Sequence, residues 1–180
     1  MRRALVVLWV LLALAAVNVS IARKEHLLAT GTTVYLQLAP IDPRSLMQGD
    51  YMRLNYTVAN EARQALQASQ PTAGAHGLPN VDGRIVVTLD EHSVASFQRL
   101  DDGRPLAAGE RALCYRVRDD RLKFATNAFF FEEGQGRRYQ AARYGEFRVD
   151  GEGNLLLTTL RGEALEPLAP ASGADAGAGR

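Results

Sequence analysis

Several residue types on which metal proteins and redox enzymes depend are scarce in this sequence. Its 180 residues include one cysteine, Cys114, so no intramolecular disulfide can form. A lone cysteine in an alternating segment is typical of a small buried hydrophobe, and we do not expect a catalytic thiol. The three histidines lie far from one another, with no carboxylate or cysteine at ligand spacing: His26, His76 and His92. We therefore predict no metal site, and because Walker loops, dinucleotide fingerprints and nucleophile elbows are also missing, no cofactor.

Acidic residues are absent from the first 24 positions. Four of the 21 basic residues lie there, whereas all 20 acidic residues follow, so 17 basic residues face 20 acidic ones from residue 25 onward. This mildly acidic body lacks the basic surface that would neutralise phosphates, so we expect no nucleic-acid partner. The composition, 47% hydrophobic and 23% charged, is that of one ordinary globular domain.

Charge of either sign is missing from residues 4–22, ALVVLWVLLALAAVNVSIA. As a helix this run is about 28 Å long, close to the hydrocarbon thickness of a bilayer, and it predicts a single membrane span. Two alternatives stay open: a cleaved secretory signal whose basic region is Arg2 and Arg3, and a buried core helix. Arg23 and Lys24 follow the run at once and favour an uncleaved anchor. We expect the N-terminus inside the cytoplasm and the rest of the chain outside it.

Period-two alternation of apolar and polar residues dominates the rest of the chain. Eight segments have this pattern: 32–40, 50–58, 83–91, 93–100, 112–118, 121–126, 144–150 and 154–160. Short turns such as Asp119-Asp120 separate neighbouring segments and have the length typical of hairpins. The pattern predicts a mainly β fold, an antiparallel barrel or sandwich, and excludes βαβ units.

Two helical insertions interrupt the alternation. Residues 58–71 repeat small and apolar residues at helical spacing and stop at a proline, and residues 134–145 are a shorter candidate ended by Gly145. The tail is rich in Ala, Gly, Ser and Pro, has no aromatic residue and is expected to be disordered. The predicted organisation is a membrane anchor (1–24), a β domain (25–167) and a disordered tail (168–180).

Turn-forming and charged residues are dense just before the strand predicted over 50–58. They lie in the stretch DPRSLMQGDYMRLNY, whose first residue is Asp42. Pro43 fixes its own φ and biases Asp42 to extended geometry, and Arg44 can pair with Asp42 or Asp50 in a planar fork. Gly49 and Asp50 are typical of a tight turn or bulge that leads into the strand. These residues predict a shaped corner loop of the β domain.

The same stretch carries a family resemblance. By alternation Leu54 and Tyr56 share one face, expected to be the core face, and Tyr51 lies on the other. The pattern Gly49-Asp50-Tyr51-x-x-Leu54-x-Tyr56 resembles, at all five defining positions, the motif of the GDYXXLXY family of uncharacterised bacterial membrane-anchored proteins. The resemblance includes the anchor, the early strands and the later segment NAFFFEEGQGRRYQAARYGEFRVD. It implies a location in the cell envelope beside multi-spanning membrane proteins, and it implies no established reaction.

That later segment is the second place where function is expected. Three phenylalanines starting at Phe129 cannot all face one core from a strand, so at least one is expected to meet a helix, the membrane or a partner. Glu132 and Glu133 follow, and Arg143 and Tyr144 come shortly after. Carboxylates beside arginines can bind a polar ligand, and structural pairing among themselves is the interpretation we favour.

Catalysis stays an alternative. A membrane-anchored β domain whose strand opens with Gly-Asp is similar to the signal-peptidase arrangement, in which a serine nucleophile precedes this pair and a lysine acts as base. Ser45 with Lys123 is the dyad this chain offers. Ser45 lies only four residues before Gly49, however, and the spacing of that pattern places Ile41 at the nucleophile position. A second pairing, of Asp50 with Glu132 as acid and base, has no spacing that tests it.

The function we predict is therefore non-catalytic. We expect a protein anchored in the inner membrane, with its β domain in the periplasm, that binds or helps to assemble an integral membrane protein of the envelope. The oligomeric state is left open. The remaining alternative is a module that binds a small polar ligand in a pocket lined by Asp42, Arg44, Asp50 and Glu132.

Overall fold

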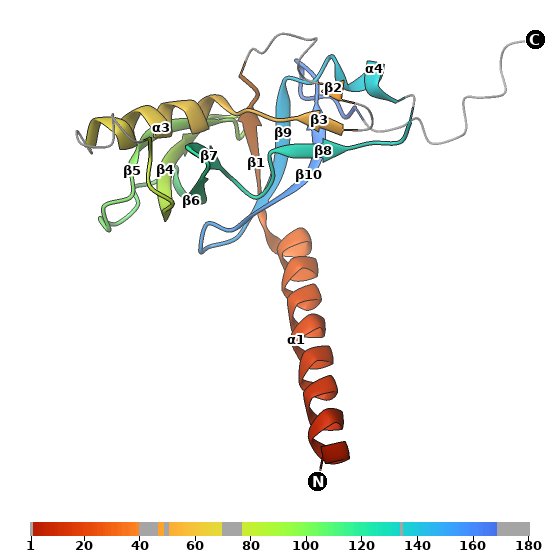
Figure 1. The fold of residues 1–180 in the computed structure, drawn as a ribbon. Helices are drawn as coiled ribbons and strands as arrows, with labels where there is room; N and C mark the ends of the chain where they lie inside the picture. The colour runs from red at the N-terminus through yellow and green to blue at the C-terminus, as the bar shows by residue number, and fades with distance from the viewer. Residues whose placement is uncertain (1, 40–46, 49–50, 70–76, 134, 169–180) are drawn as a thin grey trace, which may run out of the picture.

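The computed structural model describes residues 2–39, 47–48, 51–69, 77–133 and 135–168. Within these residues a long N-terminal helix carries a mainly β domain, which consists of three antiparallel sheets and two further helices (Figure 1). The mainly β class with an N-terminal apolar helix, predicted from the sequence, is confirmed. Of the predicted tail, Leu168 packs on the core, and residues 169–180 lie outside the described residues.

Helix α1 (Arg2–Thr30) projects away from the β domain (Figure 1). Its segment Val6–Thr30 is long and apolar enough to cross a membrane, and its most apolar part makes no buried contact with the rest of the molecule. The side chains of residues 6–26 are exposed all round, so the alternative of a buried core helix is wrong. The helix continues past residue 24, where the sequence predicts the end of the anchor.

Gly31 joins α1 directly to the first strand. The Gly31 N–H donates to the Leu27 carbonyl oxygen at 2.9 Å, and the Gly31 carbonyl oxygen accepts a hydrogen bond from Arg148 Nη1 at 3.1 Å. A Cβ at this position would lie 2.5 Å from the Leu27 oxygen, so only glycine fits here without a shift of the backbone. Because β1 begins at Thr32, the helix enters the β domain without a linker.

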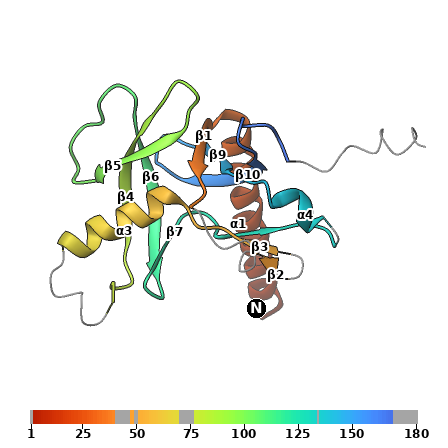
Figure 2. The same ribbon diagram turned by 90° about the horizontal axis from the view of Figure 1, so that it is seen from above.

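The first sheet stands over the end of α1 and has the order β1-β9-β10 (Figure 2). Its strands are β1 (Thr32–Gln37), β9 (Tyr144–Val149) and β10 (Leu155–Arg161). Alternate side chains point to the core, so Val34, Leu36 and Phe147 are fully buried. The hairpin between β9 and β10 accepts a hydrogen bond from the neighbouring sheet, Cys114 N–H to Gly153 O at 2.8 Å.

The second and third sheets lie on opposite sides of the domain. The second has the order β5-β4-β6-β7, and its strands are β4 (Asp82–Leu89), β5 (Ala95–Leu100), β6 (Glu110–Arg118) and β7 (Arg121–Lys123). Helix α3 (Thr57–Ser69) packs along it through Val58, Ala59, Ala62 and Leu66 (Figure 2). The third sheet has the order β2-β3-β8 and consists of β2 (Met47–Gln48), β3 (Tyr51–Arg53) and β8 (Ala128–Phe130).

Strand β2 lies where the sequence predicts a loop, and three more elements differ from the sequence prediction. The strand predicted over 50–58 ends at Arg53, because the Tyr56 carbonyl oxygen accepts the first N–H groups of α3 and the chain turns into the helix. The helix predicted over 134–145 is a single turn, α4 (Gly136–Tyr139), since β9 already begins at Tyr144. Strand β8 was not predicted, because its aromatic run has no alternation.

Two glycines in the turn between β9 and β10 form a matched pair for a stability test. Gly153 has φ of +89°, and a Cβ there would lie 2.8 Å from the Ala112 carbonyl oxygen, whereas a Cβ at Gly151 would meet nothing within 4 Å. We expect Gly153→Ala to lower the free energy of unfolding by more than about 1 kcal/mol, and Gly151→Ala to change it by less than about 0.5 kcal/mol. Chemical denaturation measures both, and equal losses would contradict the assigned turn geometry.

Candidate functional site

The GDYXXLXY stretch lies across the third sheet and the start of α3. Strands β2 and β3 pair antiparallel, with Met47 opposite Met52 and Gln48 opposite Tyr51. The structure therefore describes Tyr51, Leu54 and Tyr56 of the motif. The other candidates from this part of the chain lie outside the described residues: Asp42, Pro43, Arg44, Ser45, Gly49 and Asp50. The predictions that rest on them, the corner loop and the pocket they line, stay predictions.

Leu54 and Tyr56 face the core, as the alternation predicts. Leu54 is 2% exposed, and its N–H donates to the Asn127 carbonyl oxygen at 2.8 Å. The Tyr56 carbonyl oxygen accepts the N–H groups of Ala59 at 3.0 Å and Asn60 at 3.2 Å, which begins α3. The end of the motif therefore fixes both the approach to β8 and the direction of the helix.

The Tyr56 ring is the aromatic centre of the core. It is fully buried and meets Phe124 and Phe147 edge to face, with centroid separations of 6.0 and 5.5 Å. Its hydroxyl lies 3.5 Å from the Thr126 carbonyl oxygen, at the long limit of a hydrogen bond. Burial raises the pKa of this phenol far above its ordinary range, so the hydroxyl stays neutral and serves packing.

Tyr51 lies on the opposite face of β3, beside an exposed aromatic strand. Its ring centroid is 5.8 Å from that of Phe130, which lies opposite Tyr51 on the paired strand β8. The Phe130 side chain is 75% exposed. Phe129 and Phe131 are half-buried and contact Tyr139 of α4, with centroid separations of 5.0 and 5.3 Å. The prediction that the three phenylalanines do not share one core is confirmed. We call Tyr51, Phe129, Phe130, Phe131 and Tyr139 the aromatic edge.

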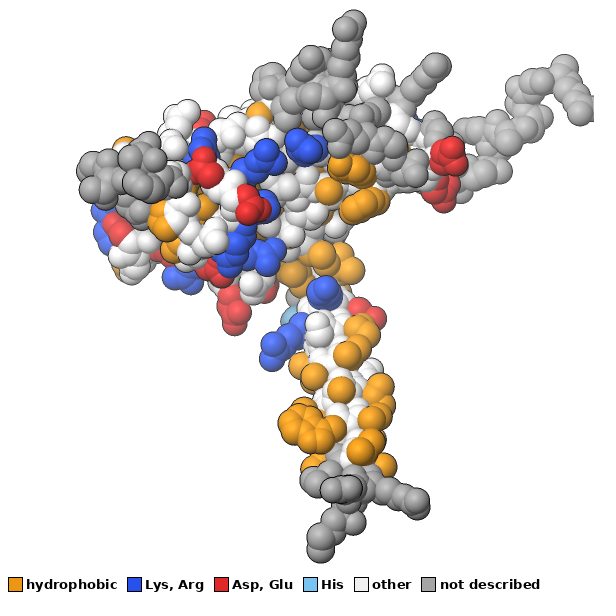
Figure 3. Space-filling view, in the orientation of Figure 1, with side chains coloured by type: hydrophobic (Ala, Val, Ile, Leu, Met, Phe, Trp, Pro, Cys, Tyr) orange, Lys and Arg blue, Asp and Glu red, His pale blue; other side chains and the backbone are white. Residues whose placement is uncertain are grey.

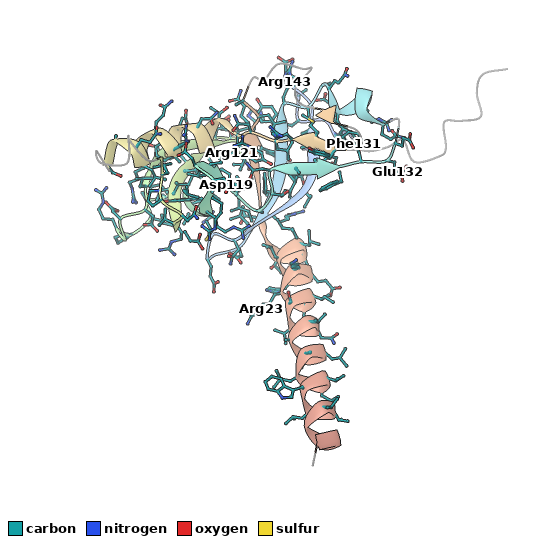
Figure 4. All side chains as sticks on the ribbon, in the orientation of Figure 1. Arg23, Asp119, Arg121, Phe131, Glu132 and Arg143 are labelled. Atoms are coloured by element: carbon teal, nitrogen blue, oxygen red, sulfur yellow. The ribbon has the colours of Figure 1, made fainter. Side chains whose placement is uncertain are left out.

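The charged candidates of the later segment do not converge. Glu132 lies just beyond β8 (Figure 4). Glu132 and Glu133 are both exposed, and neither makes an ion pair with the side chains that the structure describes. Arg143 holds the first sheet through its backbone, because its N–H donates to Arg161 O and its carbonyl oxygen accepts from Leu38 N–H, each at 2.8 Å. Its side chain is exposed. Tyr144 is half-buried and begins β9.

A polar groove of about 890 Å³ opens between the start of α3, the end of β3 and the turn from β6 to β7. Figure 3 shows basic and acidic side chains gathered on the face of the β domain beside α3. The charged residues that line the groove are Arg53, Arg63, Asp119, Asp120, Arg121 and Lys123, and the amides are Asn55, Asn60 and Asn127. Sequence reasoning missed this groove, because its arginines come from β3, α3 and β7, which are separate elements of the chain.

Fixed ion pairs form one wall of the polar groove. Arg63 pairs with Asp120 and also donates from Nε to the Asp120 carbonyl oxygen at 3.1 Å. The Leu78 N–H, which donates to Asp120 Oδ1 at 2.8 Å, and the Arg63 guanidinium lower the pKa of the Asp120 carboxyl. Lys123 Nζ lies 3.5 Å from Asp119 Oδ2 at the exposed end of the hairpin. The Ser45–Lys123 dyad stays a prediction, because Ser45 lies outside the described residues.

Two arginines and one amide oxygen of the polar groove have no partner in the part of the chain that the structure describes. Arg53 and Arg121 are exposed and make no ion pair with any described residue. Asn127 Oδ1 is buried and has no hydrogen-bond donor among the described residues. The groove thus combines surplus positive charge with unused hydrogen-bonding groups, whereas no cluster of metal-binding side chains occurs in the described part of the chain.

The fold and the motif define a class: a β domain built around a buried tyrosine of the GDYXXLXY stretch and carried on a helix able to cross a membrane. The chain belongs to the GDYXXLXY protein family, whose model matches residues 13–160. This range includes most of α1, the motif and all three sheets. Comparison with curated proteins found no match, and comparison with solved structures found none.

The buried Tyr56 phenol gives a test at high pH. Its pKa is raised above the ordinary 10.0, so the unfolded chain loses this proton first and the stability that Tyr56 contributes is full below pH 10 and falls as the pH rises further. We expect Tyr56→Phe to unfold at a higher pH than the wild type. At neutral pH the two should differ by less than about 1 kcal/mol, because the hydroxyl makes only a long hydrogen bond.

Circular dichroism during an alkaline titration measures this shift. Tyr35→Phe is the control for the loss of a phenolic hydroxyl at a half-buried site in β1. Identical alkaline midpoints for Tyr56→Phe and the wild type would contradict the role assigned to the buried phenol.

Proposed function

We propose that the protein is a non-catalytic partner of an integral membrane protein, which it binds through the aromatic edge of its β domain. In this proposal residues 1–24 anchor the chain in the inner membrane, residues 25–167 form the binding domain in the periplasm, and residues 168–180 form a disordered tail. The observation that carries the proposal is the exposed Phe130 on a strand at the edge of its sheet.

The helix supports the membrane part of the proposal. Val6–Thr30 is apolar on every side, which suits lipid, and its charged residues gather at one end as Arg23, Lys24 and Glu25. From Arg23 to Thr30 the helix rises by only about 10 Å, so the β domain is held close to the headgroups. A partner with short extramembrane loops is within reach of a domain at that height.

The aromatic edge supports the binding part. Strand β8 pairs with β3 on one side, and no other described strand pairs with its outer side. Free strand edges pair readily with other chains, and aromatic side chains are enriched at protein interfaces. A phenylalanine that is 75% exposed beside such an edge combines both properties. Figure 1 places β8 over the α1 side of the domain, whereas α3 and β4 to β7 lie toward the other side.

Site-specific photo-crosslinking in native membranes tests this proposal with the full-length protein. We expect a photoreactive residue at position 130 to form an adduct with one integral membrane protein, because Phe130 lies within the proposed interface. Leu106 is the matched control, since it is also an exposed apolar residue, at 43% exposure, and lies in the loop between β5 and β6. We expect no adduct with that protein from position 106.

A charge substitution separates binding from folding. We expect Phe130→Asp to abolish copurification of the crosslinked protein and to leave the melting temperature unchanged, because the side chain makes little buried contact. Leu106→Asp should leave copurification intact. Equal adducts from both positions, or copurification that survives Phe130→Asp, would refute the aromatic edge as the interface.

A further inference from the structure

We propose that the polar groove binds a small anionic ligand that also carries hydroxyl groups, such as a sugar acid or a phosphorylated polyol. The anionic group lies between Arg53 and Arg121, and the hydroxyls meet the amides of Asn55, Asn60 and Asn127. This site is separate from the aromatic edge and does not depend on the partner proposed above.

The charge of the groove selects an anion. Four cationic side chains line it against two carboxylates. Arg63 with Asp120 and Lys123 with Asp119 form ion pairs, so the surplus falls on Arg53 and Arg121. A guanidinium presents several N–H donors in a fork that fits carboxylate and phosphate oxygens. Two such groups in one groove, with no carboxylate partner among the residues that the structure describes, can bind an oxyanion from outside.

The amides select hydroxyl groups. Carboxamides donate and accept hydrogen bonds, and this suits the hydroxyls of a polyol. Asn127 provides the sharpest evidence, because its buried Oδ1 has no donor among the described residues and a buried acceptor without a donor is unfavourable. Rotation of this amide toward the groove would let a ligand hydroxyl donate to Oδ1. The groove volume of about 890 Å³ lies within the range of small-molecule sites.

The position of the groove favours a ligand from solution. Figure 4 shows Arg121 and Asp119 on the side of the β domain, beside α3 and away from α1. A bilayer around α1 would therefore lie below the groove, and the headgroups of that bilayer would not face it. We assign the ligand to the soluble phase for this reason.

Isothermal titration of the full-length protein in phosphatidylcholine nanodiscs tests the site. The probes are glucuronate and glycerol 3-phosphate, and the neutral controls are glucose and glycerol. We expect at least one anion to bind in a saturable way and both neutral compounds to fail. Arg53→Gln and Arg121→Gln should each weaken binding about tenfold, the usual effect of losing one charged hydrogen bond.

Matched variants separate the groove from general charge effects. Arg111 is an exposed arginine on β6 outside the groove, also without an ion-pair partner among the described residues, and Arg111→Gln should leave binding unchanged. Asn127→Leu should weaken binding of the hydroxylated anion without lowering the melting temperature, because the acceptor that it removes has no donor among the described residues. Melting curves show that each variant is folded.

Three results would overturn the proposal. The first is the absence of anion binding to the folded wild type, and the second is an equal loss of affinity in Arg111→Gln and Arg53→Gln. The third concerns the source of the ligand. It would be a lower affinity for glycerol 3-phosphate in nanodiscs that contain phosphatidylglycerol, seen in the wild type but not in Arg53→Gln. In that case a lipid headgroup occupies the groove, and the assignment of the ligand to the soluble phase is wrong.

Discussion

Burial of one tyrosine ring sets the geometry of the β domain. Tyr56 lies where the three sheets approach one another: its backbone bridges to Leu38 beyond β1, its carbonyl oxygen begins α3, and its ring packs against Phe124 and Phe147. The contacts with Leu38, Phe124 and Phe147 join segments distant in the sequence, whereas the carbonyl contact is local. A residue fixed in so many directions tolerates little displacement, and the surrounding strands take their positions from it.

The aromatic edge and the polar groove, the two surfaces proposed to bind other molecules, both follow from strand alternation in the GDYXXLXY motif. Met52 and Leu54 point inward and leave Tyr51 and Arg53 on the outer face of the same strand. Tyr51 contacts Phe130 in the aromatic edge, whereas Arg53 lines the polar groove. Thus the packing of the core orients both surfaces, because Leu54 and Tyr56 of the motif are buried and fix the strand from its inner side.

Sequence periodicity was sufficient to predict the strands and the helix that bury one face. It predicted the alternating strand that contains Val34 and Leu36, the core-facing Tyr56 and the helix that follows, because burial requires alternation in a strand and helical spacing in α3. It did not predict β8, whose pairing with β3 comes from a long-range contact. The groove was missed for the same reason: Arg53 and Arg121 line one groove only after the strands have assembled, and no local sequence pattern encodes that arrangement.

The direct passage from α1 through Gly31 into β1 has a mechanical consequence. With no slack segment between them, and with Arg148 bonded to the Gly31 carbonyl oxygen, the helix and the β domain turn as one piece. Rotation of the helix about its own axis in a bilayer would then determine the direction, within the plane of the membrane, that β8 faces. A neighbouring protein that binds the helix within the membrane would therefore also orient the β domain.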